Sequence, residues 1–70
     1  MMSLIKIHMT VTMNDGSVLS SEWDSQPLKN LQIDSRPHAT NGANMKDEQG
    51  NWIFIPWHNI KYSSYKEEGK

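Results

Sequence analysis

The 70-residue chain is long enough for one domain with one hydrophobic core, and a domain of that size has a thin margin of stability. The absence of cysteine excludes disulfides and thiolate metal sites, and the three histidines have no metal-ligand spacing, so we expect no metal and no cofactor. The net charge of −1, with scattered lysine and arginine, argues against general binding of duplex nucleic acid. Association between copies is the remaining way to add stability, so we expect a homo-oligomer.

Residues 4–13 carry the clearest strand pattern. The odd positions from 5 to 13 are apolar and the even positions from 6 to 12 are polar, and this period of two predicts a strand with one buried face. Lys6 and His8 interrupt any continuous apolar run near the N-terminus. No signal peptide or membrane span is therefore expected, and a cytoplasmic location follows by elimination.

The segment Asn14-Asp15-Gly16 ends this strand and permits two hairpin registers. A two-residue loop places Met9 opposite Glu22, which puts a charge on the apolar face. A three-residue loop keeps that face apolar, because it pairs Val11 with Leu19, Met9 with Ser21, Ile7 with Trp23 and His8 with Glu22. It also places Gly16 at the left-handed position of a G1 bulge. We therefore predict the three-residue loop and a second strand over residues 17–24.

Residues 26–35 fit either a short helical turn or a strand, because Leu28 and Leu31 are three apart while 31–35 alternate. We favour a turn at 26–30 and a short third strand at 31–35. Residues 36–44 are rich in turn formers and predict a long exposed loop. The candidate residues in this loop for binding a small ligand or a partner protein are Arg36, His38 and Asn41. The alternative is a solvated connector.

The longest apolar run follows a possible fourth strand at Met45-Lys46 and a turn at 47–50. From Trp52 to Ile55 both faces of the predicted strand are apolar, which is typical of a strand buried on two sides. We expect Trp52 and Phe54 in the core. Pro56 ends the pairing, a tight or 3-10 turn follows at 57–59, and a last strand resumes at residue 60. The domain is expected to span residues 1–65, with a polar tail at 66–70.

The chain has more aromatic residues after Pro56 than so small a core can bury. Trp57, Tyr62 and Tyr65 are therefore candidate interface anchors, since tryptophan and tyrosine are favoured at interfaces. With His58 and Lys61 nearby, the same rings offer an alternative role in stacking bases of a single strand. We favour a subunit interface, which would also cover the second apolar face of the preceding strand.

Two stretches carry a resemblance to known architecture: Met13-Asn14-Asp15-Gly16-Ser17-Val18-Leu19 and Ile53-Phe54-Ile55-Pro56-Trp57-His58-Asn59-Ile60-Lys61-Tyr62. They resemble the first hairpin and the strand, 3-10 turn and strand that close a small five-stranded barrel of the SH3-like or Sm-like kind. The resemblance implies an all-β fold, either such a barrel or a strongly bent antiparallel sheet, with one short helical or 3-10 turn. The motifs by which Sm-like proteins contact RNA are missing here, so RNA binding does not carry over. In length and style the chain also resembles small phage and prophage proteins of low-GC Gram-positive bacteria.

The sequence offers little for catalysis. No serine lies in a Gly-x-Ser-x-Gly motif, and the four glycines are isolated rather than grouped in a phosphate-binding loop. We therefore expect a non-catalytic binding protein rather than an enzyme, and its length and style favour a phage or prophage origin. Its target would be a host protein or a small ligand, as for an inhibitor or sponge of host defence. The alternative is an Sm-like binder of single-stranded nucleic acid, which is disfavoured, and no membrane partner is expected.

Overall fold

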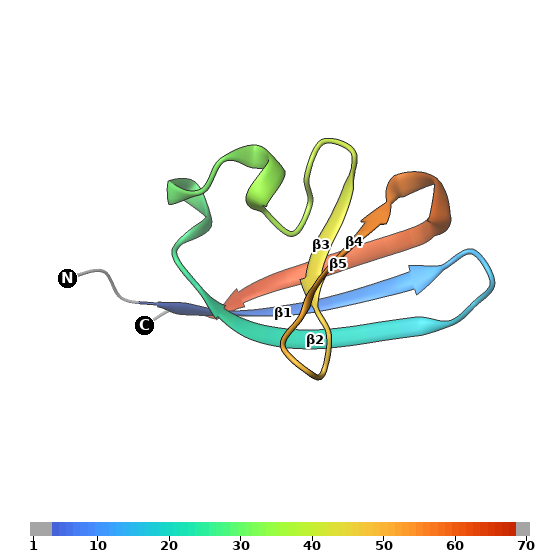
Figure 1. Ribbon diagram of the computed structural model, residues 1–70, viewed down its shortest axis with the longest axis horizontal. Helices are drawn as coiled ribbons and strands as arrows, with labels where there is room; N and C mark the ends of the chain where they lie inside the picture. Colours follow the sequence, from blue (N-terminus) through green and yellow to red (C-terminus); the bar gives the residue numbers. More distant parts are fainter. Residues whose placement is uncertain (1–3, 69–70) are drawn as a thin grey trace.

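The computed structural model describes residues 4–68, in which five strands and three single 3-10 turns follow one another. The elements are β1 (Ile5–Met13), β2 (Val18–Ser25), η1 (Leu28–Asn30), η2 (Ile33–Ser35), β3 (Gly42–Lys46), β4 (Trp52–Pro56), η3 (Trp57–Asn59) and β5 (Ile60–Glu68). They form a three-stranded antiparallel sheet of order β2-β1-β5 and a two-stranded antiparallel sheet of β3 and β4. The β3–β4 hairpin runs steeply across the longer strands (Figure 1). Within residues 4–68 no ladder joins β2 to β3, so the five predicted strands are present without forming a closed barrel.

The first hairpin has the predicted three-residue loop and register. Val11 pairs with Leu19, Met9 with Ser21, Ile7 with Trp23 and His8 with Glu22. Gly16 has a φ of 91°, in the left-handed region that glycine adopts without steric cost, and its N–H donates to the carbonyl of Met13 at 3.0 Å. The Asp15 carboxylate accepts hydrogen bonds from the hydroxyl and the N–H of Ser17, which lower the pKa of Asp15. The strand β2 lies one residue further along the chain than the predicted 17–24 at each end.

The core lies between the two sheets. Ile7, Met9 and Val11 on the inner face of β1 are fully buried, as the alternation predicts. The β3–β4 hairpin supplies the opposing side chains, of which Met45 and Ala43 are also fully buried. Trp23, Leu28 and Ile55 complete the buried cluster.

The prediction that Trp52 and Phe54 are core residues is wrong. Trp52 is 58 % exposed and Phe54 is 52 % exposed, whereas Ile55 on the alternate face is buried. The strand β4 belongs to a two-stranded sheet that covers the core with one face only. Its other face borders a cleft, so an apolar run that predicts burial on both sides is buried on one.

The predicted strand at residues 31–35 is also wrong. No described strand pairs with this stretch, and its backbone forms local 3-10 bonds instead, from Ser35 N–H to Gln32 and from Arg36 N–H to Ile33. The predicted turn at 26–30 contains η1, whose Leu28 side chain enters the core. The loop predicted to end at residue 44 ends at 41, because β3 begins at Gly42.

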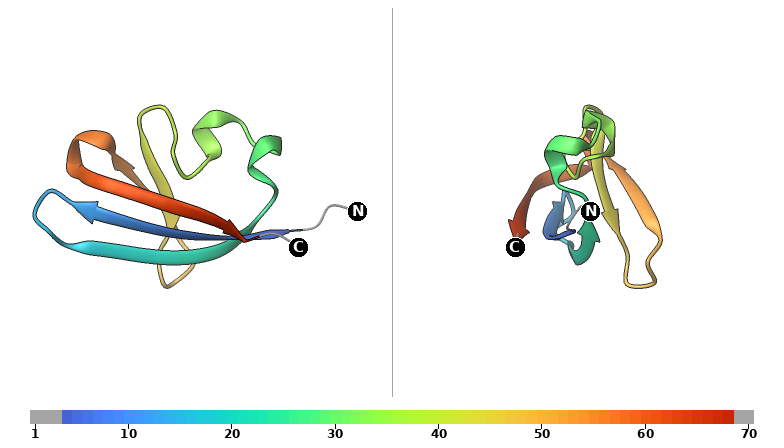
Figure 2. Two further views of the ribbon diagram at one scale, coloured as in Figure 1. Left: turned by 180° about the vertical axis from the view of Figure 1, so that it is seen from behind. Right: turned by 90° about the vertical axis from the view of Figure 1, so that its left-hand side faces the viewer.

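The unit β4–η3–β5 contains the 3-10 turn that was expected at 57–59. β5 then pairs with β1 from Ile60 to Glu68, so residues 66–68 belong to the sheet and not to a polar tail (Figure 2). The rest of the predicted tail, 69–70, and residues 1–3 lie outside the described residues. Among residues 4–68, no helix has the length and apolar character needed to cross a membrane.

Candidate binding cleft

A cleft of about 520 Å³ lies where the end of β2, the segment from Leu31 through η2, and the outer face of the β3–β4 sheet meet. Trp23, Trp52, Phe54 and Leu31 give it apolar walls. Asp24 and Asp34 line the same cleft, together with uncharged polar side chains. We call this site the β2–β4 cleft.

The aromatic wall is built by residues from two strands. The rings of Trp23 on β2 and Trp52 on β4 have centroids 5.5 Å apart and an interplanar angle of 79°, an edge-to-face arrangement that favours contact between aromatic quadrupoles. The ammonium group of Lys46 lies 5.1 Å from the Trp52 centroid, within the range of a cation–π interaction. Trp23 is buried, so it fixes one side of Trp52 while more than half of the Trp52 side chain stays exposed.

Phe54 owes its position to Gly42, which lies beside it in β3. A Cβ atom at Gly42 would lie 2.7 Å from the Phe54 ring and 2.9 Å from the Cα atom of Pro56, and would collide with the Ile55 carbonyl. The glycine therefore lets the ring lie close over the β3 backbone at the edge of the cleft.

The two carboxylates of the cleft differ in their partners. The ammonium group of Lys6 lies 3.8 Å from the Asp24 carboxylate, a loose and exposed ion pair. The Asp34 carboxylate accepts a long bond of 3.4 Å from the Thr40 N–H, and within residues 4–68 it forms no ion pair. The side-chain amide of Asn44 donates to the carbonyls of Asp34 and Arg36, both at 2.9 Å, and so fixes the η2 turn against β3.

Three of the predicted site residues meet in a second cluster formed by the loop before β3 and by η3 and β5. The His38 ring makes edge-to-face contacts with Trp57, at a centroid distance of 5.4 Å, and with Tyr65, at 4.8 Å. Partial burial lowers the pKa of His38, which favours the neutral imidazole. Its Nε2 atom lies 2.9 Å from the Ser63 hydroxyl oxygen. The Trp57 indole N–H donates to the carbonyls of Ala39 and Thr40, at 3.0 and 3.1 Å.

These contacts fix the loop before β3, and the second cluster is therefore separate from the β2–β4 cleft. Trp57 is half-buried and uses its only side-chain donor within the chain, and His38 is enclosed by rings. A serine beside a neutral histidine is the start of a nucleophile–base pair. Neither Ser63 nor His38 lines the β2–β4 cleft, and within residues 4–68 no carboxylate is bonded to His38. The pair therefore holds the loop against β5.

The other predicted site residues do not join a common site. Tyr62 is 63 % exposed and lies with Lys61 at the start of β5. The backbone carbonyl of His58 accepts a hydrogen bond of 2.7 Å from the side-chain amide of Asn14. The Arg36 side chain donates to the carbonyl of Leu31 at 3.1 Å. Asn41 is exposed, and its carbonyl accepts a bond from the Trp57 backbone N–H at 3.3 Å.

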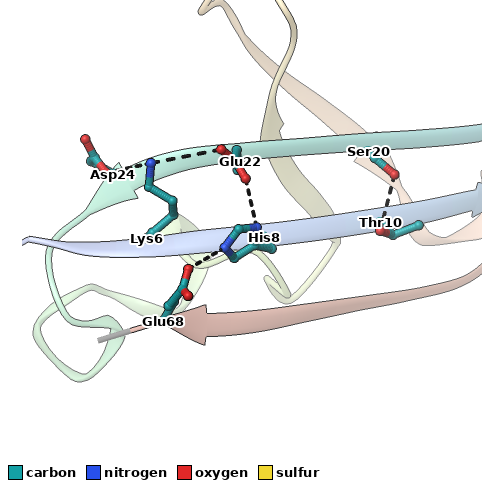
Figure 3. Close-up of polar contacts among 7 residues, drawn as sticks. All are labelled: Lys6, His8, Thr10, Ser20, Glu22, Asp24 and Glu68. Carbon is teal, nitrogen blue, oxygen red and sulfur yellow. Dashed lines mark hydrogen bonds and ion pairs between the residues drawn. The ribbon is translucent and has the colours of Figure 1, made fainter. Parts of the chain in front are cut away.

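A row of charged side chains crosses the outer face of the three-stranded sheet (Figure 3). His8 on β1 lies between two carboxylates, with Nδ1 2.9 Å from Glu22 on β2 and Nε2 2.9 Å from Glu68 on β5. The hydrogen bond from His8 is the main cause that lowers the pKa of Glu68. The predicted cross-strand pair of His8 and Glu22 is confirmed, and Glu68 extends it across all three strands.

We found no match to this chain among protein-family models, curated proteins or solved structures.

Sequence reasoning missed the cleft because it assigned Trp52 and Phe54 to the core, whereas both side chains are more than half exposed. The sequence did contain one signal of the cleft. Both faces of residues 52–55 are apolar, and the chain has few other apolar residues that could cover the second face of this strand. Asp24 and Asp34 gave no such signal, because only the path of the chain between them brings both residues to the same cleft.

Proposed function

We propose that this is a non-catalytic binding protein and that the β2–β4 cleft is its binding site. The observation that carries the proposal is the pair of exposed aromatic side chains, Trp52 and Phe54, at a cleft of about 520 Å³. Burying a large apolar side chain stabilises a fold by roughly 1.5–3 kcal/mol, a large gain for so small a domain. A chain that leaves two such rings exposed beside a cleft has the features of a recognition site.

The proposed target is a host protein or a small ligand, and the proposed setting is a phage or prophage acting in the host cytosol, as an inhibitor or sponge of defence would. The resemblance in length and style supports this setting. The cleft volume supports a ligand or protein segment of moderate size, since small-molecule sites occupy roughly 300–1,000 Å³.

The SH3-like or Sm-like barrel stays a proposal for the architecture. It is supported by the pairing of β1 with both β2 and β5, and by the 3-10 turn that joins β4 to β5. Binding of single-stranded nucleic acid through this architecture has less support. The acidic residues Asp24 and Asp34 would repel phosphates near the exposed rings of Trp52 and Phe54.

The proposal is tested by capture from bacterial lysate, with bound proteins and small molecules identified by mass spectrometry. Wild-type protein is compared with the double variant Trp52→Ala/Phe54→Ala. Tyr62→Ala is the matched control, because Tyr62 is an exposed aromatic residue that does not line the cleft. We expect a partner that wild type and Tyr62→Ala retain and the double variant loses. Equal capture by all three proteins, or capture by none, would contradict the proposal.

A further inference from the structure

The chemistry of the cleft narrows the class of its occupant. Resting on the binding function above, we propose that the β2–β4 cleft receives the guanidinium group of an arginine on a segment of a partner protein. Both the acidic residues of the lining and the exposed aromatic wall favour such a group.

The lining is acidic, and the two lysines that contact its residues, Lys6 beside Asp24 and Lys46 over Trp52, do not themselves line the cleft. Asp24 and Asp34 are the charged residues among the described lining, and the Asp24 carboxylate turns to the outer face of the three-stranded sheet, where Lys6 pairs with it (Figure 3). Asp34 forms no ion pair within residues 4–68, and the Asp24 pair with Lys6 is loose and exposed. A cation entering the cleft would therefore find at Asp34 a carboxylate that forms no ion pair and accepts one long hydrogen bond, in a cleft with apolar walls.

The aromatic wall also favours a cation. Trp52 already attracts one ammonium group, that of Lys46, at 5.1 Å from its centroid. More than half of the Trp52 side chain remains exposed, so surface is left for a second group. A guanidinium suits this surface better than an ammonium, because it is planar, stacks on aromatic faces and donates two parallel hydrogen bonds to a carboxylate.

The size and polarity of the remaining lining favour a protein segment over a free ion. A single guanidinium fills only part of about 520 Å³, which leaves room for the neighbouring residues of a segment to contact Leu31 and Phe54. The oxygen atoms of Ser25, Gln26 and Ser35 in the lining can accept from the remaining N–H groups.

The test uses the three tryptophan indole N–H signals of the ¹⁵N-labelled protein. The probe is the tripeptide Gly-Arg-Gly, acetylated and amidated at its ends, and the matched control contains citrulline, which keeps the shape of arginine but lacks its charge. We expect the arginine peptide to shift the signals of Trp23 and Trp52 in a saturable manner. The Trp57 signal is an internal reference, because that indole donates to backbone carbonyls outside the cleft.

The citrulline peptide should bind about tenfold more weakly, since an ionised partner roughly doubles the strength of such hydrogen bonds. Asp34→Asn, which keeps an acceptor for Thr40, should weaken the arginine peptide several-fold, and Glu48→Gln outside the cleft should not. Asp24→Asn is the second variant if Asp34→Asn does not fold. Binding should also weaken as salt rises.

Equal affinity for the two peptides, equal loss in Asp34→Asn and Glu48→Gln, or shifts at Trp57 alone would overturn the arginine proposal. No shift with either peptide would overturn it too. If capture from lysate still depends on Trp52 and Phe54 in that case, the binding function stands and only the class of occupant is wrong.

Discussion

Individual side chains contribute to stability according to which face of their strand meets the core. Met9 is fully buried, whereas Trp52 is more than half exposed. We expect Met9→Ala to lower the free energy of unfolding by about 2–5 kcal/mol, through lost transfer energy and a cavity. Trp52→Ala should cost about 1 kcal/mol, not the 3–5 kcal/mol typical of a core tryptophan. Urea denaturation of both variants checks the order, and a larger loss for Trp52→Ala would show that the ring is buried.

His38 provides a prediction about protonation. Burial lowers its pKa below the ordinary value of 6.5, so the unfolded chain takes up a proton at a higher pH than the folded protein does. The stability associated with neutral His38 is therefore present above pH 6.5 and is lost as pH falls from 6.5 through the folded pKa. NMR titration should give a midpoint below 6.5 in the folded protein and near 6.5 in urea. A folded midpoint at or above 6.5 would contradict the burial.

Glu68 provides a second prediction about how stability depends on pH, and the direction is the one expected for a carboxylate with a lowered pKa. The hydrogen bond and charge of His8 lower its pKa below 4.5, so the stabilisation is present above 4.5 and is lost as pH falls through the folded pKa. We expect Glu68→Gln to be less stable than wild type near pH 5.5, with a difference that shrinks as pH falls below 4.5. Glu67→Gln, on the opposite face of β5, is the control for removal of one charge. Thermal melts across this range should show no such trend for the control.

At the scale of elements, the β3–β4 hairpin depends on one glycine. A Cβ atom at Gly42 would collide with backbone atoms of Ile55 and Pro56, which cannot turn aside as a flexible side chain can. We expect Gly42→Ala to cost about 1–3 kcal/mol, the range for overpacking, and to move Phe54 away from the cleft. Thermal unfolding measures the first effect, with Ser64→Ala on exposed β5 as the control. A melting temperature equal to that of wild type would contradict the close approach.

The elements differ in how far local sequence specifies them. The first hairpin was predicted to the residue pair, because strict alternation and a loop ending in Gly16 leave one register with an apolar face. Residues 31–35 alternate too, yet they form a 3-10 turn, since no described strand edge pairs with them. A strand needs a distant partner, and a stretch of five residues does not encode whether that partner is present.

At the scale of the whole molecule, the amount of exposed apolar surface favours association. Large hydrophobic side chains remain exposed on both sheets, among them Val18, Leu19, Tyr62, Trp52 and Phe54. We expect a homo-oligomer at micromolar concentration, with a mass above the 8.1 kDa of one chain. Multi-angle light scattering measures this mass directly. A value of 8.1 kDa at that concentration would contradict association between copies.

The sequence by itself determined the all-β class, the first hairpin with its register, and the 3-10 turn between β4 and β5, because period, turn residues and proline act over a few neighbours. Only the tertiary structure decided which apolar residues are buried. An apolar run predicts burial of both faces, but the second layer that would cover Trp52 and Phe54 depends on where η1, η2 and β3 lie. In this chain those segments leave a cleft in its place and bring Asp24 and Asp34 to its wall.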